Sequence, residues 1–253
     1  MGIVYNNSIV TNGLVLCLDA ANKRSHSGAG TIWTDLVSSN TASLVNGPTY
    51  DNQNGGNVVL DGTNDYIQIL NSVTSQTLSP AVATFIIWIK PNKYNSSSSC
   101  SIISRGNYNT SGGFFIHLGE SSNIAQVRAT FSKSTTTSYQ FETTSNINLR
   151  NWGVWSQIAV SVSDKINLYV DGILRDSINR TVSSIVYGNG TINTSGDTNL
   201  VLCSSLSYAP TLDQGVGWKP YNGSVSFFQM YNRVLSAAEI LQNYNATRGR
   251  FEV

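Results

Sequence analysis

The feature that most constrains this chain is a two-residue alternation of apolar and polar side chains. In the segment QVRATF, residues Val127, Ala129 and Phe131 alternate with polar neighbours. The segments SQIAVSV (156–162) and KINLYV (165–170) show the same pattern. Because successive side chains of a β-strand point to opposite faces, this period indicates strands with one face on a core and one polar face.

Two further segments are apolar on both faces, ATFIIWI (83–89) and SFFQMY (226–231). They suit central strands that are covered on both sides. Between the apolar runs lie dipeptides that favour tight hairpins, since both of their residues tolerate positive φ. These are Asp61-Gly62, Gly112-Gly113, Asp171-Gly172 and Asn222-Gly223. About a dozen strands at such close spacing predict an all-β sandwich or barrel.

One helix is expected near the C-terminus. Ser236 followed by Glu239 forms a capping box, and Leu235 and Ile240 are spaced as a hydrophobic staple around it. We expect this short helix to lie across a sheet edge and to end near Gly249. No composition break separates a second domain, so residues 13–253 are predicted to form one domain. Residues 1–12 are predicted to form a polar arm that could insert into a neighbouring subunit.

Composition excludes several classes of protein. Only 11% of residues are charged and the net charge is +1, whereas an ordinary domain has about 25% charged residues. Ser, Thr and Asn make up roughly a third of the chain. Without a basic stripe a nucleic-acid partner is not expected, and so many apolar residues argue against disorder. No apolar run is long enough for a membrane span, and the N-terminus does not resemble a secretory signal.

The cysteines and histidines offer little chemistry. Three scattered cysteines are too few for a disulfide framework or a zinc site, and we expect them to be core residues or loop thiols: Cys17, Cys100 and Cys203. The two histidines, His26 and His117, lie far apart in the sequence. Each is expected to be a surface or hydrogen-bonded imidazole rather than a catalytic one.

Seven segments occur in an order typical of a known family: GLVLCLDA, WTDL, VVLDGTNDYI, TFIIWIKP, IISRG, NWGVWSQIAVSVSDKINLYVDG and YNGSVSFFQMYNRVLSAAEI. The chain thereby resembles the laminin-G-like, concanavalin A-like lectin and glucanase superfamily, in the form found in tailed-bacteriophage virion proteins. The resemblance spans about residues 13–246. It implies an antiparallel two-sheet jelly-roll sandwich with one short C-terminal helix. Within it, Trp88 and Trp155 are expected to anchor the core between the sheets, and Asp65 to bond the Asp61-Gly62 turn.

The superfamily that the chain resembles includes glycosidases, but the carboxylates of this sequence do not support such an activity. Glycosidases need two carboxylates about the scissile bond, ~5–10 Å apart. The chain has four glutamates. Glu239 belongs to the capping box, Glu252 lies in the tail, and neither Glu120 nor Glu142 has a second carboxylate nearby in sequence. We therefore expect no enzymatic activity, and a glycoside hydrolase is only a distant alternative.

Relatives of this fold often bind Ca²⁺ through Asp residues and backbone carbonyls. The candidates here are Asp197 and Asp213, and neither has an acidic neighbour. No cofactor is expected.

A glycan site is predicted in the long irregular segment 206–222. Sugar faces stack on aromatic rings, and amide or carboxylate groups bind hydroxyls. Alternatively, Trp218 and Tyr221 pack this loop onto the sandwich or line a subunit contact. The candidate residues are Tyr208, Asp213, Gln214, Trp218 and Tyr221.

These observations lead to two compatible hypotheses. The first is a non-enzymatic virion protein, either a capsid decoration or a tail or fibre appendage, which self-associates and binds other virion proteins. The second is a lectin-like adhesin that recognises host-surface polysaccharide. In both, the protein is expected to fold in the host cytoplasm, to end in the virion, and to bind neither nucleic acid nor membrane.

Overall fold

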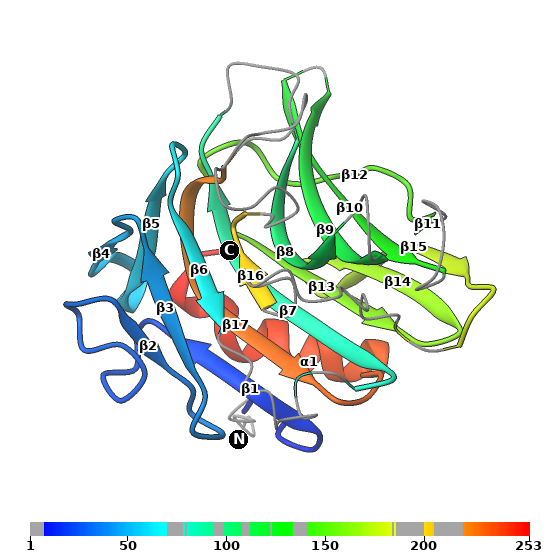
Figure 1. The fold of residues 1–253 in the computed structure, drawn as a ribbon, viewed down its shortest axis with the longest axis horizontal. Coiled ribbons are helices and arrows are strands. Elements are labelled where there is room, and N and C mark those ends of the chain that lie inside the picture. The colour runs from blue at the N-terminus through cyan, green and yellow to red at the C-terminus, as the bar shows by residue number, and fades with distance from the viewer. Residues whose placement is uncertain are drawn as a thin grey trace, which may run out of the picture.

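The computed structural model describes residues 8–69, 78, 80–93, 99–107, 112–121, 123–133, 141–183, 185, 200–204 and 220–253. These residues form a sandwich of two antiparallel β-sheets, with one α-helix lying against one of them (Figure 1). The predicted fold class, with its two sheets and C-terminal helix, is confirmed. No helix in these ranges is long and apolar enough to cross a membrane.

Sheet A has eight strands in the order β15–β14–β13–β7–β17–β5–β4, and β1 also pairs with β17. Every strand pair in it is antiparallel. The strands are β1 (Leu14–Asp19), β4 (Thr49–Asp51), β5 (Asn57–Asp61), β7 (Ala83–Pro91), β13 (Ser156–Val162), β14 (Lys165–Val170), β15 (Ile173–Asn179) and β17 (Asn222–Tyr231).

Sheet B has nine strands in the order β11–β10–β9–β8–β16–β6–β3–β2, and β12 pairs with β10. Several of its strands have only two or three residues, which is why the sequence predicted fewer. The strands are β2 (Ile32–Thr34), β3 (Thr41–Val45), β6 (Tyr66–Ile69), β8 (Cys100–Asn107), β9 (Gly112–Ser121), β10 (Ile124–Ser132), β11 (Phe141–Thr143), β12 (Ile147–Asn148) and β16 (Leu200–Leu202).

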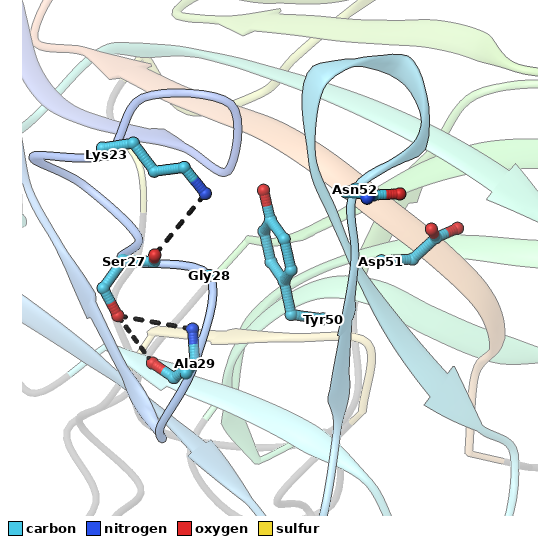
Figure 2. Close-up of a pocket in the computed structure, with 7 residues that line it drawn as sticks. All are labelled: Lys23, Ser27, Gly28, Ala29, Tyr50, Asp51 and Asn52. Atoms are coloured by element: carbon cyan, nitrogen blue, oxygen red, sulfur yellow. Dashed lines mark hydrogen bonds between the residues drawn. The ribbon is translucent and has the colours of Figure 1, made fainter.

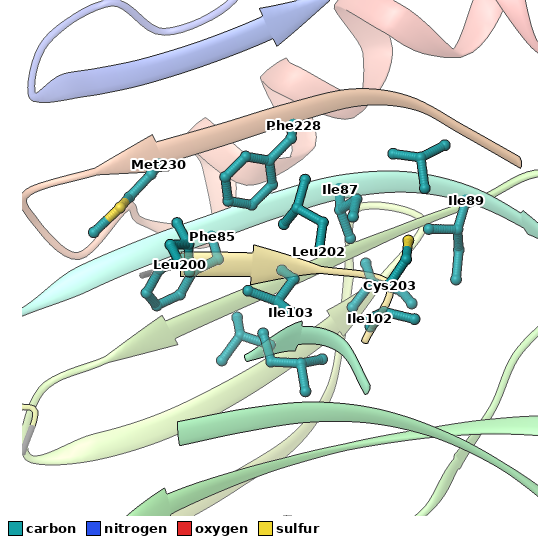
Figure 3. Close-up of a cluster of buried hydrophobic side chains, with 14 of the residues drawn as sticks. Phe85, Ile87, Ile89, Ile102, Ile103, Leu200, Leu202, Cys203, Phe228 and Met230 are labelled. Carbon is teal, nitrogen blue, oxygen red and sulfur yellow. The ribbon is translucent and has the colours of Figure 1, made fainter. Parts of the chain in front are cut away.

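The main core lies between the two sheets and follows the predicted alternation. Val127, Ala129 and Phe131 of β10 point into it, as do the matching residues of β13 and β14. Figure 3 shows side chains of β7 and β17 meeting those of β8 and β16 in this layer. The three cysteines are free and buried, in agreement with the first of the two predicted placements: Cys17, Cys100 and Cys203.

Strands β7 and β17 are buried on both faces, as predicted, because α1 (Ala237–Thr247) covers the outer face of sheet A. The expectation that this helix crosses a sheet edge is wrong. Its buried Ile240 packs with Ile86 of β7 and Ala159 of β13, and Tyr244 packs with Trp88. The helix therefore forms a third layer over the middle of the sheet.

Trp88 and Trp155 are buried, but not between the sheets. Phe85, Ile87 and Ile89 of β7 point inward, so Trp88 must point outward. The Trp88 ring stacks on Phe251 with 4.2 Å between ring centroids, and its Nε1 donates to Thr247 Oγ1 at 2.9 Å. These tryptophans anchor the helix to sheet A instead.

The capping box that starts α1 is confirmed. Ser236 accepts a hydrogen bond from Glu239 N, and the Glu239 carboxylate accepts one from Ser236 N. Leu235 and Ile240 lie in one cluster, as expected of a hydrophobic staple. At the other end, Gly249 lies inside a short 3-10 helix, Arg248–Arg250, and α1 ends at Thr247.

Residues 8–12 of the predicted arm lie on the domain itself. Val10 N donates to Asn243 Oδ1 at 2.7 Å, and the Tyr231 hydroxyl donates to Val10 O at 2.8 Å. Gln242 Nε2 donates to Ser8 O at 2.8 Å. This segment is thus attached to α1 and β17 of its own domain, and residues 1–7 of the arm lie outside the described residues.

One of the four predicted hairpins is confirmed, since Asp171 and Gly172 both have positive φ and join the paired strands β14 and β15. Asp61-Gly62 forms no hairpin, because it links β5 of sheet A to β6 of sheet B, and Asp65 accepts the expected hydrogen bond from Asp61 N at 3.1 Å. Asn222 and Gly223 instead lie inside β17, as Gly112 and Gly113 do inside β9. A Cβ on Gly223 would lie 2.4 Å from Lys90 O, so close strand packing explains that glycine.

Candidate functional site

Most of the predicted glycan and calcium residues lie outside the described part of the chain: Asp197, Tyr208, Asp213, Gln214 and Trp218. Tyr221 is described, and of the two alternatives predicted for it the structure shows packing on the sandwich and not a ring open to a glycan. Its side chain is 0% exposed and belongs to the main core. Its hydroxyl donates to Ser224 O at 3.1 Å, and burial raises the pKa of the phenol well above 10. Tyr221 therefore holds the start of β17 in the sandwich and offers no ring to a ligand.

The structure shows a different candidate site, which sequence reasoning missed. It is a shallow cavity of about 580 Å³ between the loop after β1 and the residues of β4 (Figure 2). We call it the Tyr50 pocket, and its lining residues are Lys23, Ser27, Gly28, Ala29, Tyr50, Asp51 and Asn52. The sequence signals this pocket only by a run of small residues, Ser27–Ala29, close to Lys23, and such a run is typical of any turn.

The loop that forms one wall is fixed by a buried histidine. His26 is 0% exposed and stacks on the Tyr50 ring, with centroids 4.9 Å apart and planes at 4°. Its Nδ1 accepts a hydrogen bond from Gly28 N at 3.1 Å. Burial and the nearby Lys23 charge lower the pKa of His26, so the imidazole is neutral at pH 7. His26 therefore positions Tyr50 and the loop without adding charge to the pocket.

Lys23 supplies the cation of the pocket. Its Nζ lies 5.1 Å from the centroid of the Tyr50 ring and donates to Ser27 O at 3.5 Å. Gly28, with φ +95°, leaves room for it, because a Cβ at that position would lie 2.8 Å from Nζ. An ammonium over an aromatic face is favourable. The lysine head group is thus placed at the pocket by its surroundings.

The opposite wall carries an acid and an amide. Asp51 accepts hydrogen bonds from Gln53 N at 3.1 Å and from Asn57 Nδ2 at 3.5 Å. In Figure 2 the Asp51 and Asn52 side chains extend away from Lys23, with Tyr50 between them. The pocket therefore offers hydrogen-bond donors and acceptors on separate walls around one half-buried aromatic ring.

Two of the four glutamates have structural partners. Glu142 accepts from Arg180 Nε at 3.2 Å and from Thr181 N at 2.7 Å, and Glu239 pairs with Arg233. His117 is buried in β9, and burial lowers its pKa well below 6.5. Within the described ranges, no group of three or more His, Cys, Asp or Glu is placed to hold a metal ion.

Solved structures with the same fold include neurotoxin binding domains and a sialidase. The binding domain of botulinum neurotoxin DC, in complex with SialylT, has a TM-score of 0.64 and 11% identity over 96% of this chain and 52% of its own. The binding domain of serotype G has a TM-score of 0.61 and 14% identity over 91% and 50%. A Trypanosoma rangeli sialidase in complex with the inhibitor DANA has a TM-score of 0.59 and 16% identity over 94% and 33%.

This chain thus spans about half of the neurotoxin domains and a third of the sialidase. These likenesses concern the fold. A comparison with curated proteins gives no match. The family model described as the concanavalin A-like lectin/glucanases superfamily matches residues 61–241, well over half of the chain, and leaves the Tyr50 pocket outside the match. The chain belongs to the concanavalin A-like lectin/glucanases superfamily.

Proposed function

We propose that this protein is a non-enzymatic, lectin-like glycan-binding protein and that the Tyr50 pocket is its binding site. The observation that carries the proposal is the composition of that pocket: one aromatic ring, an ammonium, an amide and a carboxylate around about 580 Å³ on a lectin-type sandwich. Such a volume suits a small ligand. The separate donors and acceptors match sugar hydroxyls, which both donate and accept hydrogen bonds.

The glutamate contacts support a binding role over hydrolysis. Glycosidases need an acid and a second carboxylate free to act at the sugar, ~5–10 Å apart. The Glu142 carboxylate is already hydrogen-bonded to Arg180 and Thr181, and Glu239 caps a helix. Neither of them lines the Tyr50 pocket, and the one acid that does is Asp51. The proposal therefore assigns no catalytic residue.

A glycan array followed by calorimetric titration of each hit tests the proposal. Asn52→Ala should weaken binding, because Asn52 is exposed in the pocket wall. Asn151→Ala is the matched control, since Asn151 is an exposed asparagine away from the pocket. Trp218→Ala tests the site predicted from the sequence. Loss of binding in Trp218→Ala alone would move the site to that loop, and no binding to any glycan would reject the function.

We also propose that the protein serves on a bacteriophage virion, as a capsid decoration or a tail or fibre appendage that binds host-surface polysaccharide. The sequence resemblance and the low, balanced charge support this role, since a neutral amide-rich surface resists nonspecific contact. Its partners would be other virion proteins and further copies of itself. Immunogold labelling of intact particles would locate it. A protein that stays monomeric and ignores particles lacking it would contradict the virion role.

A further inference from the structure

We propose that the sugar bound in the Tyr50 pocket is acidic, with its anionic group placed against the Lys23 ammonium. This inference rests on the proposed function and adds the chemical class of the ligand. It concerns the charge of the sugar and not the identity of any particular polysaccharide.

The first argument is that Lys23 has no acidic partner. In the part of the chain that the structure describes, no carboxylate oxygen lies within 4.0 Å of its Nζ, whereas Lys133 and four arginines each have such a contact: Arg150, Arg180, Arg233 and Arg250. The hydrogen bond to Ser27 O is long, at 3.5 Å. An ammonium has three donors, so most of the hydrogen-bonding capacity of Lys23 remains available to a ligand.

The second argument is that the neighbouring groups leave this charge unbalanced. His26 is neutral at pH 7, and Asp51 extends away from Lys23 and bonds Gln53 N. Asp19, from the preceding strand, pairs with Arg250 at 2.8 Å. The two charged groups that line the pocket therefore lie on opposite sides of Tyr50, and an anion is favoured on the Lys23 side.

The third argument is that the ammonium lies where a ligand in the pocket can reach it. Lys23 is exposed, the Tyr50 ring lies beside its ammonium, and Gly28 lets the ammonium approach that ring. A carboxylate or sulfate would form an ion pair with the ammonium in addition to the hydrogen bond, whereas a neutral hydroxyl would only accept the hydrogen bond. Lysine acts as a point charge, so its chemistry accepts either anionic group.

The test compares ligands that differ in charge. Oligogalacturonate is titrated by calorimetry against the same oligomer with its carboxylates methyl-esterified, and a sulfated galactan forms a third arm. We expect the acidic oligomers to bind about tenfold more tightly than the ester at low salt. The difference should shrink at 0.5 M NaCl, because salt screens an exposed ion pair. Binding of one acidic arm alone supports the proposal and names the anionic group.

Two variants separate a specific contact from general attraction. Lys23→Gln should lose the preference for acidic oligomers, whereas Arg24→Gln, which removes the same charge from an exposed neighbour outside the pocket, should keep it. Gly28→Ala should weaken acidic binding as well, because its Cβ would displace the ammonium.

The outcomes distinguish this inference from the proposed function. Equal binding of the acidic and esterified oligomers, still sensitive to Asn52→Ala, would overturn the inference and leave glycan binding intact. Equal losses in Lys23→Gln and Arg24→Gln would overturn it too. Absence of binding to these oligomers and to every glycan of the array would remove both.

Discussion

Replacing Glu239 by Gln should reveal how much the charge at the start of α1 stabilises the fold. The Glu239 carboxylate accepts hydrogen bonds from Ser236 N at 2.8 Å and from Arg233 Nη1 at 3.0 Å. The bonds to Arg233 and to Ser236 N lower the pKa of Glu239 from 4.5 to about 2. Gln keeps an oxygen for the capping box, so the substitution removes mainly the charge.

The magnitude follows from the pKa. Lowering a pKa from 4.5 to about 2 corresponds to roughly 3 kcal/mol of folding free energy before screening. The side chains of Arg233 and Glu239 are 28% and 30% exposed, and water weakens such pairs strongly. We therefore expect Glu239→Gln to lower the free energy of unfolding by about 1 kcal/mol at pH 7.

The pH dependence gives the sign. A carboxyl whose pKa is lowered by folding stabilises the protein fully above its unfolded pKa, and the stabilisation is lost as pH falls through the folded pKa. The penalty of Glu239→Gln should thus fall to less than half between pH 7 and pH 3. Urea unfolding of both proteins, followed by tryptophan fluorescence, measures it. An equal penalty at pH 7 and pH 3 would refute the ionic origin of the stabilisation. Arg233→Gln should also lower the free energy of unfolding, and the double variant should lose less than the sum of the two single losses, because both substitutions break the same ion pair.

Three other substitutions or probes test the packing. Arg180→Met should lower the free energy of unfolding by about 3 kcal/mol in urea titrations, because the Glu142 carboxylate, 7% exposed, loses its nearer and buried cation and keeps only Lys133 at 3.9 Å. An unchanged midpoint would contradict this. Gly113→Ala should lower the free energy of unfolding by more than about 1 kcal/mol and lower the melting temperature, since φ is +129° and the new Cβ would lie 2.1 Å from a backbone oxygen. The same change at Gly249, where φ is not positive and no atom lies within 4 Å of the new Cβ, is the control. Burial raises the pKa of the Cys17 thiol to about 12 and that of the Cys203 thiol well above 9. In the native protein these two thiols should therefore resist iodoacetamide at pH 8, and they should react once urea unfolds the protein.

The sequence predicts the strands well because alternation records which residues face the core. Val127 and Ile158 both point into the space between the sheets, as their spacing required. Alternation does not say what covers the other face of a strand, so the position of Trp88 beneath α1 could not be foreseen. The capping box was readable because it depends on residues three positions apart, Ser236 and Glu239.

The Tyr50 pocket could not be predicted for a different reason. Its walls come from residues 23–29 and 50–52, and only the pairing of β4 with β5 and the stacking of His26 on Tyr50 bring them together. No local pattern encodes that contact. Tyr221 shows the same limit, because the sequence left open whether its ring binds a ligand or packs on the sandwich, and only its neighbours in the core show that it is buried.

The place of β17 in sheet A also has a consequence for synthesis on the ribosome. Strand β17 pairs with β1, β5 and β7, yet it lies more than 130 residues after β7 in the chain. Until Asn222–Tyr231 has been translated, those three strands lack their common neighbour and expose unpaired edges, which promote aggregation. Folding of this sheet must therefore wait until β17 has left the ribosome and must be slow, as contacts of long sequence separation imply. A nascent chain stalled before β17 should be a substrate for chaperones that bind exposed strands.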